Sequence, residues 1–576
     1  MNIQQLLVSR FQSALVALGV PDAPVPVSKA TRPGCGEYQF NGAMALSKQL
    51  KRPPRDIAQM IVDAVEIDDV VSQLEIAGPG FINITLAPQW LAAQSLSAIN
   101  DARLNIEQQA QQTIVVDYSA PNLAKEMHVG HLRSTIIGDG VVKALEFMGH
   151  NVIRQNHMGD WGTQFGMLLA HLSDKLAANE VAETALSDLE DFYRQAKVRF
   201  DEEEGFADRA REYVVRLQGG DADCLALWQN FIDVSIEHSE EVYRKLNVTL
   251  QKTDVMGESA YNDDLAAVIA DLQTAGIAVE DQGAQVVFLD ELADKNGKPA
   301  VYIVQKSGGG YLYATTDLAA IRYRSNTLKA NRTLIFTDAR QALHFKQTEM
   351  VARKAGFLSA AESYQHCPFG MMLGKDGKPF KTRTGGTVKL IDLLDEAVER
   401  AARLLAQRDN DFSPDELTMM AEKIGIGAVK YADLSKARTT DYVFDWDSML
   451  SFEGNTAPYL QYAYTRIQSI FNKAGDSVDA SAAISIQVDA EKALATKLLQ
   501  YQEAIEIVVS EATPHVLCTY LYELASLFMK FYEACPILKD DVAPDAKQSR
   551  LQLCRLTQST LRHGLGLLGI ETLDKM

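Results

Sequence analysis

The segment from Thr113 to Arg133 constrains the fold more than any other part of this 576-residue chain. It starts with a β-branched run, residues 113–116, which predicts a buried strand. A polar turn with Pro121 and Asn122 follows, and His128-Val129-Gly130-His131 then opens a helical pattern. A helix N-terminus offers N–H groups and the positive end of a dipole, and Gly130 leaves room for a flat ring. The junction therefore predicts a phosphate-binding site.

The periodicity of the remaining sequence predicts three domains. Residues 1–112 are expected to form a small α/β unit, with helices at 3–18 and 44–65 and a strand pair at 74–76 and 81–84. Residues 113–395 alternate between strands and helices, which predicts an α/β domain on a mostly parallel sheet. Residues 396–576 predict an α-helical bundle.

The α/β domain is expected to contain five strands and one long insertion. The strands are predicted at residues 113–116, 151–154, 285–289, 301–303 and 333–336. The insertion, at about residues 172–250, is charged and helical.

Composition excludes several classes of protein. The net charge of -20 counts against a protein that coats DNA, although a local basic surface remains compatible with it. The 6 cysteines are scattered without a C-x-x-C pair, which argues against a zinc site and favours a reducing cytoplasm. No apolar run is long enough to span a bilayer. We therefore expect a cytoplasmic protein with neither membrane nor DNA as a partner.

The His128/His131 pair is the first of four clusters with candidate chemistry. On spacing alone, a pair with one capping and one exposed histidine is about as plausible as a phosphate-binding pair. The position of the pair after a buried strand favours the phosphate-binding pair, because ligands bind at the C-terminal ends of parallel strands. Lys125 is either solvated or a point charge for phosphates. Asp117 and Asn122 either hold a small polar substrate or are turn residues.

The other three clusters also admit two interpretations each. Residues 159–166, GDWGTQFG, predict close backbone packing beside a pocket, or a tight turn with a core tryptophan. Tyr313 and Asp317 share a helical face, which suits a guanidinium receptor or an ordinary i,i+4 pair. Residues 372–387 contain three lysines, one arginine and four glycines, and predict a mobile phosphate clamp or a surface hairpin turning at Asp376-Gly377.

Taken in order, these clusters resemble the arginyl-tRNA synthetases, a family of class I aminoacyl-tRNA synthetases of bacterial type. The pattern S-x-P-N-x-A-K-x-x-H-x-G-H-L-R-S-T is present from Ser119 to Thr135. GDWGTQFG and YLYATTD (residues 311–317) follow, then GNTAPYLQYAYTR (454–466) and the terminal GLGLLGIETLDKM (564–576). The resemblance covers essentially the whole chain.

The resemblance implies a fold and a reaction. The fold is an N-terminal domain that contacts the tRNA D-loop, a Rossmann-type catalytic domain with insertions, and a helical anticodon-binding domain. The reaction is an arginine–tRNA ligase reaction, in which L-arginine and ATP give arginyl-adenylate and the arginyl group passes to the 3′-terminal adenosine of tRNA(Arg). It also implies tRNA-dependent activation, ATP as substrate with Mg²⁺, no structural metal, and a monomer without an obligate protein partner.

Site residues carried over from the resemblance fall into four groups. The catalytic positions are Lys125, His128, His131, Lys381 and Arg383. The ATP-binding positions are His128, Gly130, His131, Met371 and Met372. The arginine-binding positions are Asp117, Asn122, Glu258, Tyr313, Asp317 and Gln341. The tRNA-binding positions are Phe81, Asn83, Tyr459, Tyr462 and Met576.

The chain departs from the general class I pattern at one loop. The K-M-S-K-S signature is absent, and Phe380-Lys381-Thr382-Arg383 stands in its place. The resemblance implies that Lys125 compensates for the missing signature lysine. It leaves open how the phosphate-binding role is divided among Lys125, Lys378, Lys381 and Arg383. Two alternative functions remain at this stage: a tRNA-independent nucleotidylyltransferase and a non-catalytic tRNA-binding paralogue.

Overall fold

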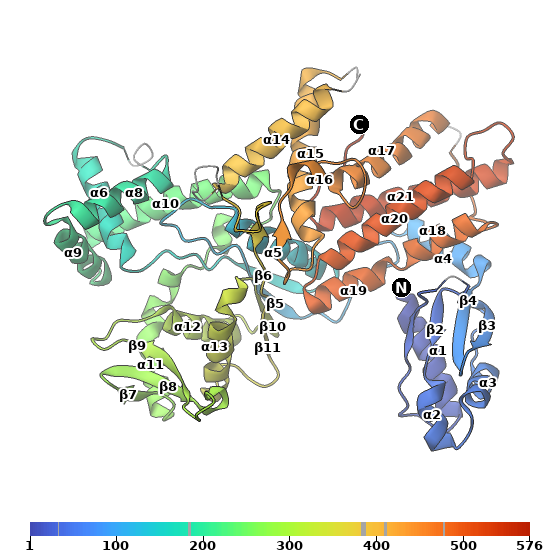
Figure 1. Cartoon of the computed structure of the whole chain (residues 1–576), viewed down its shortest axis with the longest axis horizontal. Helices are drawn as coiled ribbons and strands as arrows, with labels where there is room; N and C mark the ends of the chain where they lie inside the picture. The colour runs from blue at the N-terminus through green and yellow to red at the C-terminus, as the bar shows by residue number, and fades with distance from the viewer. Residues whose placement is uncertain (33, 182–185, 382–387, 408–411, 476–477) are drawn as a thin grey trace.

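A computed structural model describes the chain except for residues 33, 182–185, 382–387, 408–411 and 476–477. The described parts form a central parallel sheet flanked by two peripheral lobes, a C-terminal helical array and an N-terminal α/β unit at one end of the molecule (Figure 1). In those parts, no helix has both the length and the apolar character needed to cross a membrane.

The N-terminal unit packs helices against a four-stranded antiparallel sheet of order β1-β2-β4-β3. Its elements are α1 (Ile3–Ala17), β1 (Val27–Lys29), β2 (Tyr38–Phe40), α2 (Ala43–Leu50), α3 (Pro54–Ala64), β3 (Val71–Ala77) and β4 (Phe81–Leu86). The predicted strand pair is confirmed. The single helix predicted at 44–65 is wrong, because Lys51 is left-handed (φ 52°) and Pro53 precedes the new helix that Pro54 begins.

The central sheet has four parallel strands in the order β11-β10-β5-β6. These are β5 (Thr113–Asp117), β6 (Asn151–Gln155), β10 (Arg332–Ile335) and β11 (Ser363–His366). Strand β5 is central and buried along almost its whole length, as its β-branched sequence predicts. Around the sheet lie α5 (Gly130–Phe147), α12 (Tyr313–Asn326) and α13 (Ala342–Lys354).

Two predicted strands belong to a different sheet. Strands β7 (Val279–Asp281), β8 (Ala284–Leu289) and β9 (Ala300–Gln305) form a separate antiparallel sheet, beside α11 (Asn262–Thr274). Assignment of 285–289 and 301–303 to the parallel sheet is therefore wrong. Val301 and Ile303 point outward, 40% and 45% exposed. Because these outward residues are apolar, the sequence hides the alternation that marks a half-exposed strand.

The charged insertion folds as a helical lobe beside the start of α5 (Figure 1). The lobe is formed by α6 (Gln164–Ala177), α8 (Leu189–Glu202), α9 (Phe206–Gln218) and α10 (Ala222–Lys245). Gly166 allows α6 to approach α9 closely, since a side chain there would collide with the Ala210 carbonyl. This contact confirms close backbone packing at Gly166, whereas a Cβ at Gly162 would meet no atom within 4 Å, and the pocket predicted beside the GDWGTQFG segment stays a prediction.

The C-terminal part is almost entirely helical, as predicted. Its helices are α14 (Leu390–Ala406), α15 (Pro414–Leu434), α16 (Trp446–Met449), α17 (Ala457–Ala474), α18 (Asp489–Leu499), α19 (Tyr501–Glu511), α20 (His515–Ala534) and α21 (Pro544–Leu567). Helix α4 (Pro88–Asn100), which follows the N-terminal unit, packs on α18 and α21. Two short strands, β12 (Met372–Leu373) and β13 (Tyr442–Val443), pair with each other and so join the chain after β11 to this array.

Candidate functional site

The turn after β5 has an unusual backbone that a buried polar network supports. Ser119 and Ala120 both have positive φ, 71° and 45°, which non-glycine residues adopt at a cost of about 1–3 kcal/mol. The Ser134 hydroxyl accepts from the Ser119 N–H at 2.9 Å, and Thr135 Oγ1 donates to Ser119 Oγ at 2.9 Å. Tyr243, from the helical lobe, contacts the same serine hydroxyl at 2.8 Å. The residues of the signature thus hold their own turn.

His128 and His131 lie at the start of α5, with ring centroids 4.0 Å apart. Nδ1 of His128 accepts from the Gly130 N–H, and Nδ1 of His131 accepts from the His128 N–H, both at 3.0 Å. Burial lowers the pKa of both imidazoles, that of His131 to about 3. Both rings are therefore neutral, and their remaining proton is on Nε2, which is a hydrogen-bond donor.

The amides at the start of α5 are already used, contrary to the sequence expectation of free N–H groups. Gly130 donates to a histidine ring, His131 to the His128 carbonyl and Leu132 to the Val129 carbonyl. Phosphate contacts at this helix start are consequently left to side chains: the two Nε2–H groups and Lys125. The Lys125 ammonium lies 4.3 Å from the ring centroid of Tyr193, on α8.

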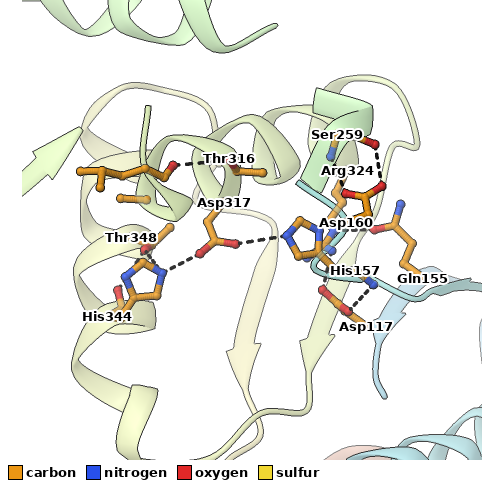
Figure 2. Close-up of polar contacts among 12 residues, drawn as sticks. Asp117, Gln155, His157, Asp160, Ser259, Thr316, Asp317, Arg324, His344 and Thr348 are labelled. Atoms are coloured by element: carbon orange, nitrogen blue, oxygen red, sulfur yellow. Dashed lines mark hydrogen bonds and ion pairs between the residues drawn. The ribbon is translucent and has the colours of Figure 1, made fainter. Parts of the chain in front are cut away.

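The carboxylates of Glu258, Asp160 and Asp317 lie near one another, and Figure 2 labels Asp160 and Asp317 beside the ends of the parallel strands. Burial raises the pKa of Glu258 to about 7, with Asp160 and Asp317 adding negative charge. The Asp160 carboxylate accepts from the Ser259 N–H at 2.8 Å and from its hydroxyl at 2.6 Å, which fixes the turn carrying Glu258. Such concentrated negative charge favours a bound cation.

Asp317 lies between two imidazoles, as Figure 2 shows. His344 Nε2 is 2.6 Å from Oδ2 of Asp317, and His157 Nε2 is 3.8 Å from Oδ1. Tyr313 begins α12, one turn before Asp317, and its ring meets the edge of His344 at 4.9 Å. Tyr313 is 64% exposed, so its phenol is accessible beside the carboxylate. Since Tyr313 begins α12, the structure confirms that Tyr313 and Asp317 share one helical face, while their role as a guanidinium receptor stays a prediction.

Asp117 has a different partner from the one that its predicted role requires. Its Oδ2 accepts from Arg324 of α12 at 2.6 Å, and its Oδ1 accepts from the His157 N–H at 3.4 Å (Figure 2). The same guanidinium donates to Gln155 at 2.6 Å. Since Asp117 is buried and occupied on both oxygens, this arrangement gives it an internal positioning role instead of direct contact with a substrate.

Asn122 and Gln341 lie on exposed turns. Asn122 bridges to Gly159, and its Oδ1 accepts from Gln164 at 3.2 Å and from the Ala124 N–H at 2.9 Å. Its amide nitrogen has no such bond within the described chain and is available to a ligand. Gln341 ends a short 3-10 turn, Ala339–Gln341, directly before α13.

The loop that replaces the second signature is a hairpin in its described part. Gly374 donates to the Lys378 carbonyl at 2.8 Å, so the chain turns at Asp376-Gly377. Met372 is buried in β12, whereas Met371 is exposed beside it. Lys378 and Lys381 are exposed. Arg383 lies outside the described residues, as do Gly385 and Gly386.

The predicted tRNA contacts occupy two distant parts of the molecule. Phe81 begins β4, and Asn83 on the same strand is only 4% exposed and accepts from Gln39 at 2.7 Å. In the helical array, Tyr462 and Met576 line a cavity of about 540 Å³, and Tyr459 joins Tyr462 in a neighbouring cavity of about 440 Å³. The structure thus brings the three C-terminal residues together.

Several site residues escaped the sequence interpretation. They are Ser119, Ser134, Thr135, Asn156, His157, Asp160, Tyr243, Arg324 and His344. Four of them, Ser119, Ser134, Thr135 and Asp160, belong to motifs named above but were assigned no function. A sequence motif does not show which of its side chains form hydrogen bonds with one another. Arg324 and His344 had no local signal, since their partners are 207 and 27 residues away.

Comparisons with known proteins identify the family of the chain. Three family models match in succession: Arginyl tRNA synthetase N terminal domain (residues 2–86), tRNA synthetases class I (R), catalytic domain (94–446), and DALR anticodon binding domain (460–576). The chain is 72% identical to an arginine–tRNA ligase of Pseudoalteromonas atlantica, with 100% of both chains covered. It belongs to the arginyl-tRNA synthetase family.

Other members of the arginyl-tRNA synthetase family are more distant but equally complete in coverage. The arginine–tRNA ligase of Colwellia psychrerythraea is 62% identical, again over 100% of both chains. The solved arginyl-tRNA synthetase of Plasmodium falciparum superposes with a TM-score of 0.86 at 29% identity, covering 100% of this chain and 99% of that one. The Thermus thermophilus structure gives 0.83 at 24% identity and supports the fold.

Proposed function

We propose that this chain activates L-arginine with ATP and transfers the arginyl group to the 3′-terminal adenosine of tRNA(Arg). The observation that carries the proposal is the neighbouring carboxylates of Glu258 and Asp317, with Tyr313 one helical turn before Asp317, in a chain 72% identical to an arginine–tRNA ligase over its whole length. A guanidinium presents planar donors that two carboxylates can pair, whereas the ammonium of lysine does not.

In the adenylation step, the α-carboxylate of arginine attacks the α-phosphorus of ATP and pyrophosphate leaves. Charge then develops on the phosphate oxygens, where preorganised donors are most effective. We assign the Nε2–H groups of His128 and His131 to these oxygens, because Nδ1 of each ring is held by a backbone amide. Lys125, Lys378 and Lys381, with Arg383, would supply positive charge to the departing pyrophosphate.

In the transfer step, a ribose hydroxyl of the terminal adenosine attacks the carbonyl carbon of arginyl-adenylate, and AMP leaves. We assign Asn122 and Gln341 to the α-amino group, whose N–H groups would donate to the side-chain carbonyl oxygens during both steps. Asp117 is assigned to positioning, since Arg324 occupies it. Met371 and Met372 would pack against the adenine, with Gly130 leaving room for the nucleotide.

The proposed enzyme also needs tRNA and Mg²⁺. Activation is proposed to require bound tRNA, with Phe81 and Asn83 toward its D-loop and the Tyr459, Tyr462 and Met576 surface toward its anticodon. Among the described residues, no three His, Cys, Asp or Glu side chains group as metal ligands. We propose that Mg²⁺ arrives with ATP, in a cytoplasmic enzyme that needs no protein partner.

The decisive experiment is ATP–pyrophosphate exchange measured with and without tRNA(Arg), with arginine, lysine or citrulline. Exchange with arginine and tRNA together, and charging of tRNA by arginine alone, are the expected results. Exchange in the complete absence of RNA would instead support a nucleotidylyltransferase. Tight tRNA binding without exchange or charging would identify a non-catalytic paralogue.

A further inference from the structure

The helical lobe holds the signature lysine through an aromatic ring. The Lys125 ammonium lies 4.3 Å from the ring centroid of Tyr193, within the distance at which a cation is attracted to a ring face. Tyr193 is on α8, in the insertion, and not on the strand–turn–helix that carries Lys125. The insertion therefore reaches the centre of the candidate site.

The start of α8 is fixed to the signature by a chain of four further contacts. The Leu189 N–H donates to the Glu126 carboxylate at 3.1 Å, and that carboxylate is 3.3 Å from Nδ1 of His238 on α10. Asp188, which caps α8, pairs with Lys389 at 2.9 Å. Lys389 in turn bridges to His128 in an antiparallel pairing. Tyr193 is thus presented by a framework attached on both sides of the histidines.

The partner of Lys125 is a ring and not a carboxylate, and that choice has an electrostatic consequence. No ion pair involves Lys125 among the described residues, although Asp188 and Glu126 both pair with other groups nearby. A carboxylate would offset the positive charge, whereas a ring quadrupole orients the ammonium and leaves its full charge for phosphate. The charge acts at the site already, because Lys125 contributes to the lowered pKa of His128 after burial.

We propose that Tyr193 is a positioning residue for Lys125, so that the helical insertion sets the geometry of the cation that the signature supplies to the pyrophosphate. This inference rests on the proposed adenylation function and on the role of Lys125 within it. Tyr193 touches no reacting atom; it acts only through the lysine.

The test is a double-mutant cycle of Tyr193→Leu and Lys125→Ala, measured by arginine- and tRNA-dependent ATP–pyrophosphate exchange. Tyr193→Leu should lower kcat between about twofold and thirtyfold, the range that a cation–ring contact supports, with the KM for arginine unchanged. Tyr193→Phe should restore the rate, since it keeps the ring. In the Lys125→Ala background, Tyr193→Leu should have no further effect.

Two controls separate positioning from folding. Tyr213→Leu removes a comparable contact in the same lobe, where Arg216 lies 5.2 Å from the ring centroid, and should leave exchange unchanged. Phenylalanine with increasing fluorine substitution at position 193 keeps the shape of the ring but weakens its negative face, and should lower kcat stepwise. This series remains informative if Tyr193→Leu fails to fold.

Several results would overturn the inference. They are an equal loss in Tyr193→Phe and Tyr193→Leu, a faster rate in Tyr193→Leu, a flat fluorination series, or additive losses in the double variant. Absence of exchange in the unmodified chain would refute the proposed function instead. If Lys125→Ala exchanges normally, the role assigned to Lys125 is wrong while arginylation stands.

Discussion

The guanidinium of Arg133 and the carboxylate of Asp433 form a buried ion pair, 3.1 Å apart, with side chains 1% and 0% exposed. Arg133 is two residues after His131 on α5, and Asp433 is at the end of α15 in the helical array. Arg133 also donates to the Thr440 carbonyl at 2.9 Å. The helix that carries the histidines is therefore tied directly to α15 of the C-terminal helical array.

Arg133→Met is expected to destabilise the protein by about 3–5 kcal/mol, because it leaves a buried carboxylate without its cation. Exchange activity should fall with it, since α5 loses its anchor. Arg403→Met is the matched control: its pair with Glu399 is exposed and 3.8 Å long, which predicts a change of about 0–1 kcal/mol. Urea unfolding of both variants measures the contrast, and similar losses would contradict the anchor.

Arginine binding is expected to weaken as the pH falls through about 7. The pKa of Glu258 is raised to about 7 by burial and by Asp160 and Asp317, and a guanidinium binds the ionised carboxylate. Below that pH the carboxyl must release its proton on binding, so the KM for arginine should rise by up to about tenfold per pH unit. Glu258→Gln should bind arginine weakly with a KM that does not follow this pH dependence. A steep profile in Glu258→Gln would assign the titration to another group.

A glycine after the last helix is expected to be irreplaceable. Gly569 has φ +66°, and a Cβ there would collide with the amino group of Lys430 and lie 2.8 Å from that of Lys143. Lys430 is fully buried and donates to the Leu246 and Gly569 carbonyls at 2.6 and 2.9 Å. Gly569→Ala should therefore cost about 1–3 kcal/mol in unfolding free energy.

The control for this prediction is Gly566→Ala in the last turn of α21. No atom lies within 4 Å of a Cβ built at Gly566, and its φ is outside the left-handed region. Alanine there should be neutral or stabilising by about 0.5–1 kcal/mol. Thermal unfolding distinguishes the two variants; equal melting temperatures would mean that the Lys430 contacts rearrange freely.

The sequence located strands β5, β8 and β9 but could not assign β8 and β9 to their own sheet. Strand β5 is apolar and buried, so its pattern and environment agree. Strand β9 is equally apolar in sequence but half exposed, and only the fold shows that Val301 faces outward. The break between α2 and α3 had a local signal in Pro53-Pro54, which the apolar periodicity outweighed.

Some residues of the candidate site could be related to one another from the sequence, and others could not. Tyr313 and Asp317 could be paired from the sequence, because helical spacing places them on one face. Asp117 could not be assigned, since its partner Arg324 lies 207 residues away and determines whether the carboxylate is free for a substrate. Spacing identifies residues on one element, whereas competition between partners on different elements depends on the tertiary fold.

The aromatic and basic surface on α17 is expected to bind unpaired bases of the tRNA. Arg466 donates to the Tyr462 hydroxyl at 2.8 Å, and its guanidinium lies 4.6 Å from the ring centroid of Tyr532. Bases stack on such rings with about 1–3 kcal/mol each. Tyr462→Ala should therefore raise the KM for tRNA(Arg) roughly fivefold or more, with the KM for arginine unchanged. Tyr213→Ala, in the distant helical lobe, controls for loss of a partly buried ring. Charging kinetics at varied tRNA concentration measure both, and an unchanged KM for tRNA in Tyr462→Ala would exclude this surface as a contact.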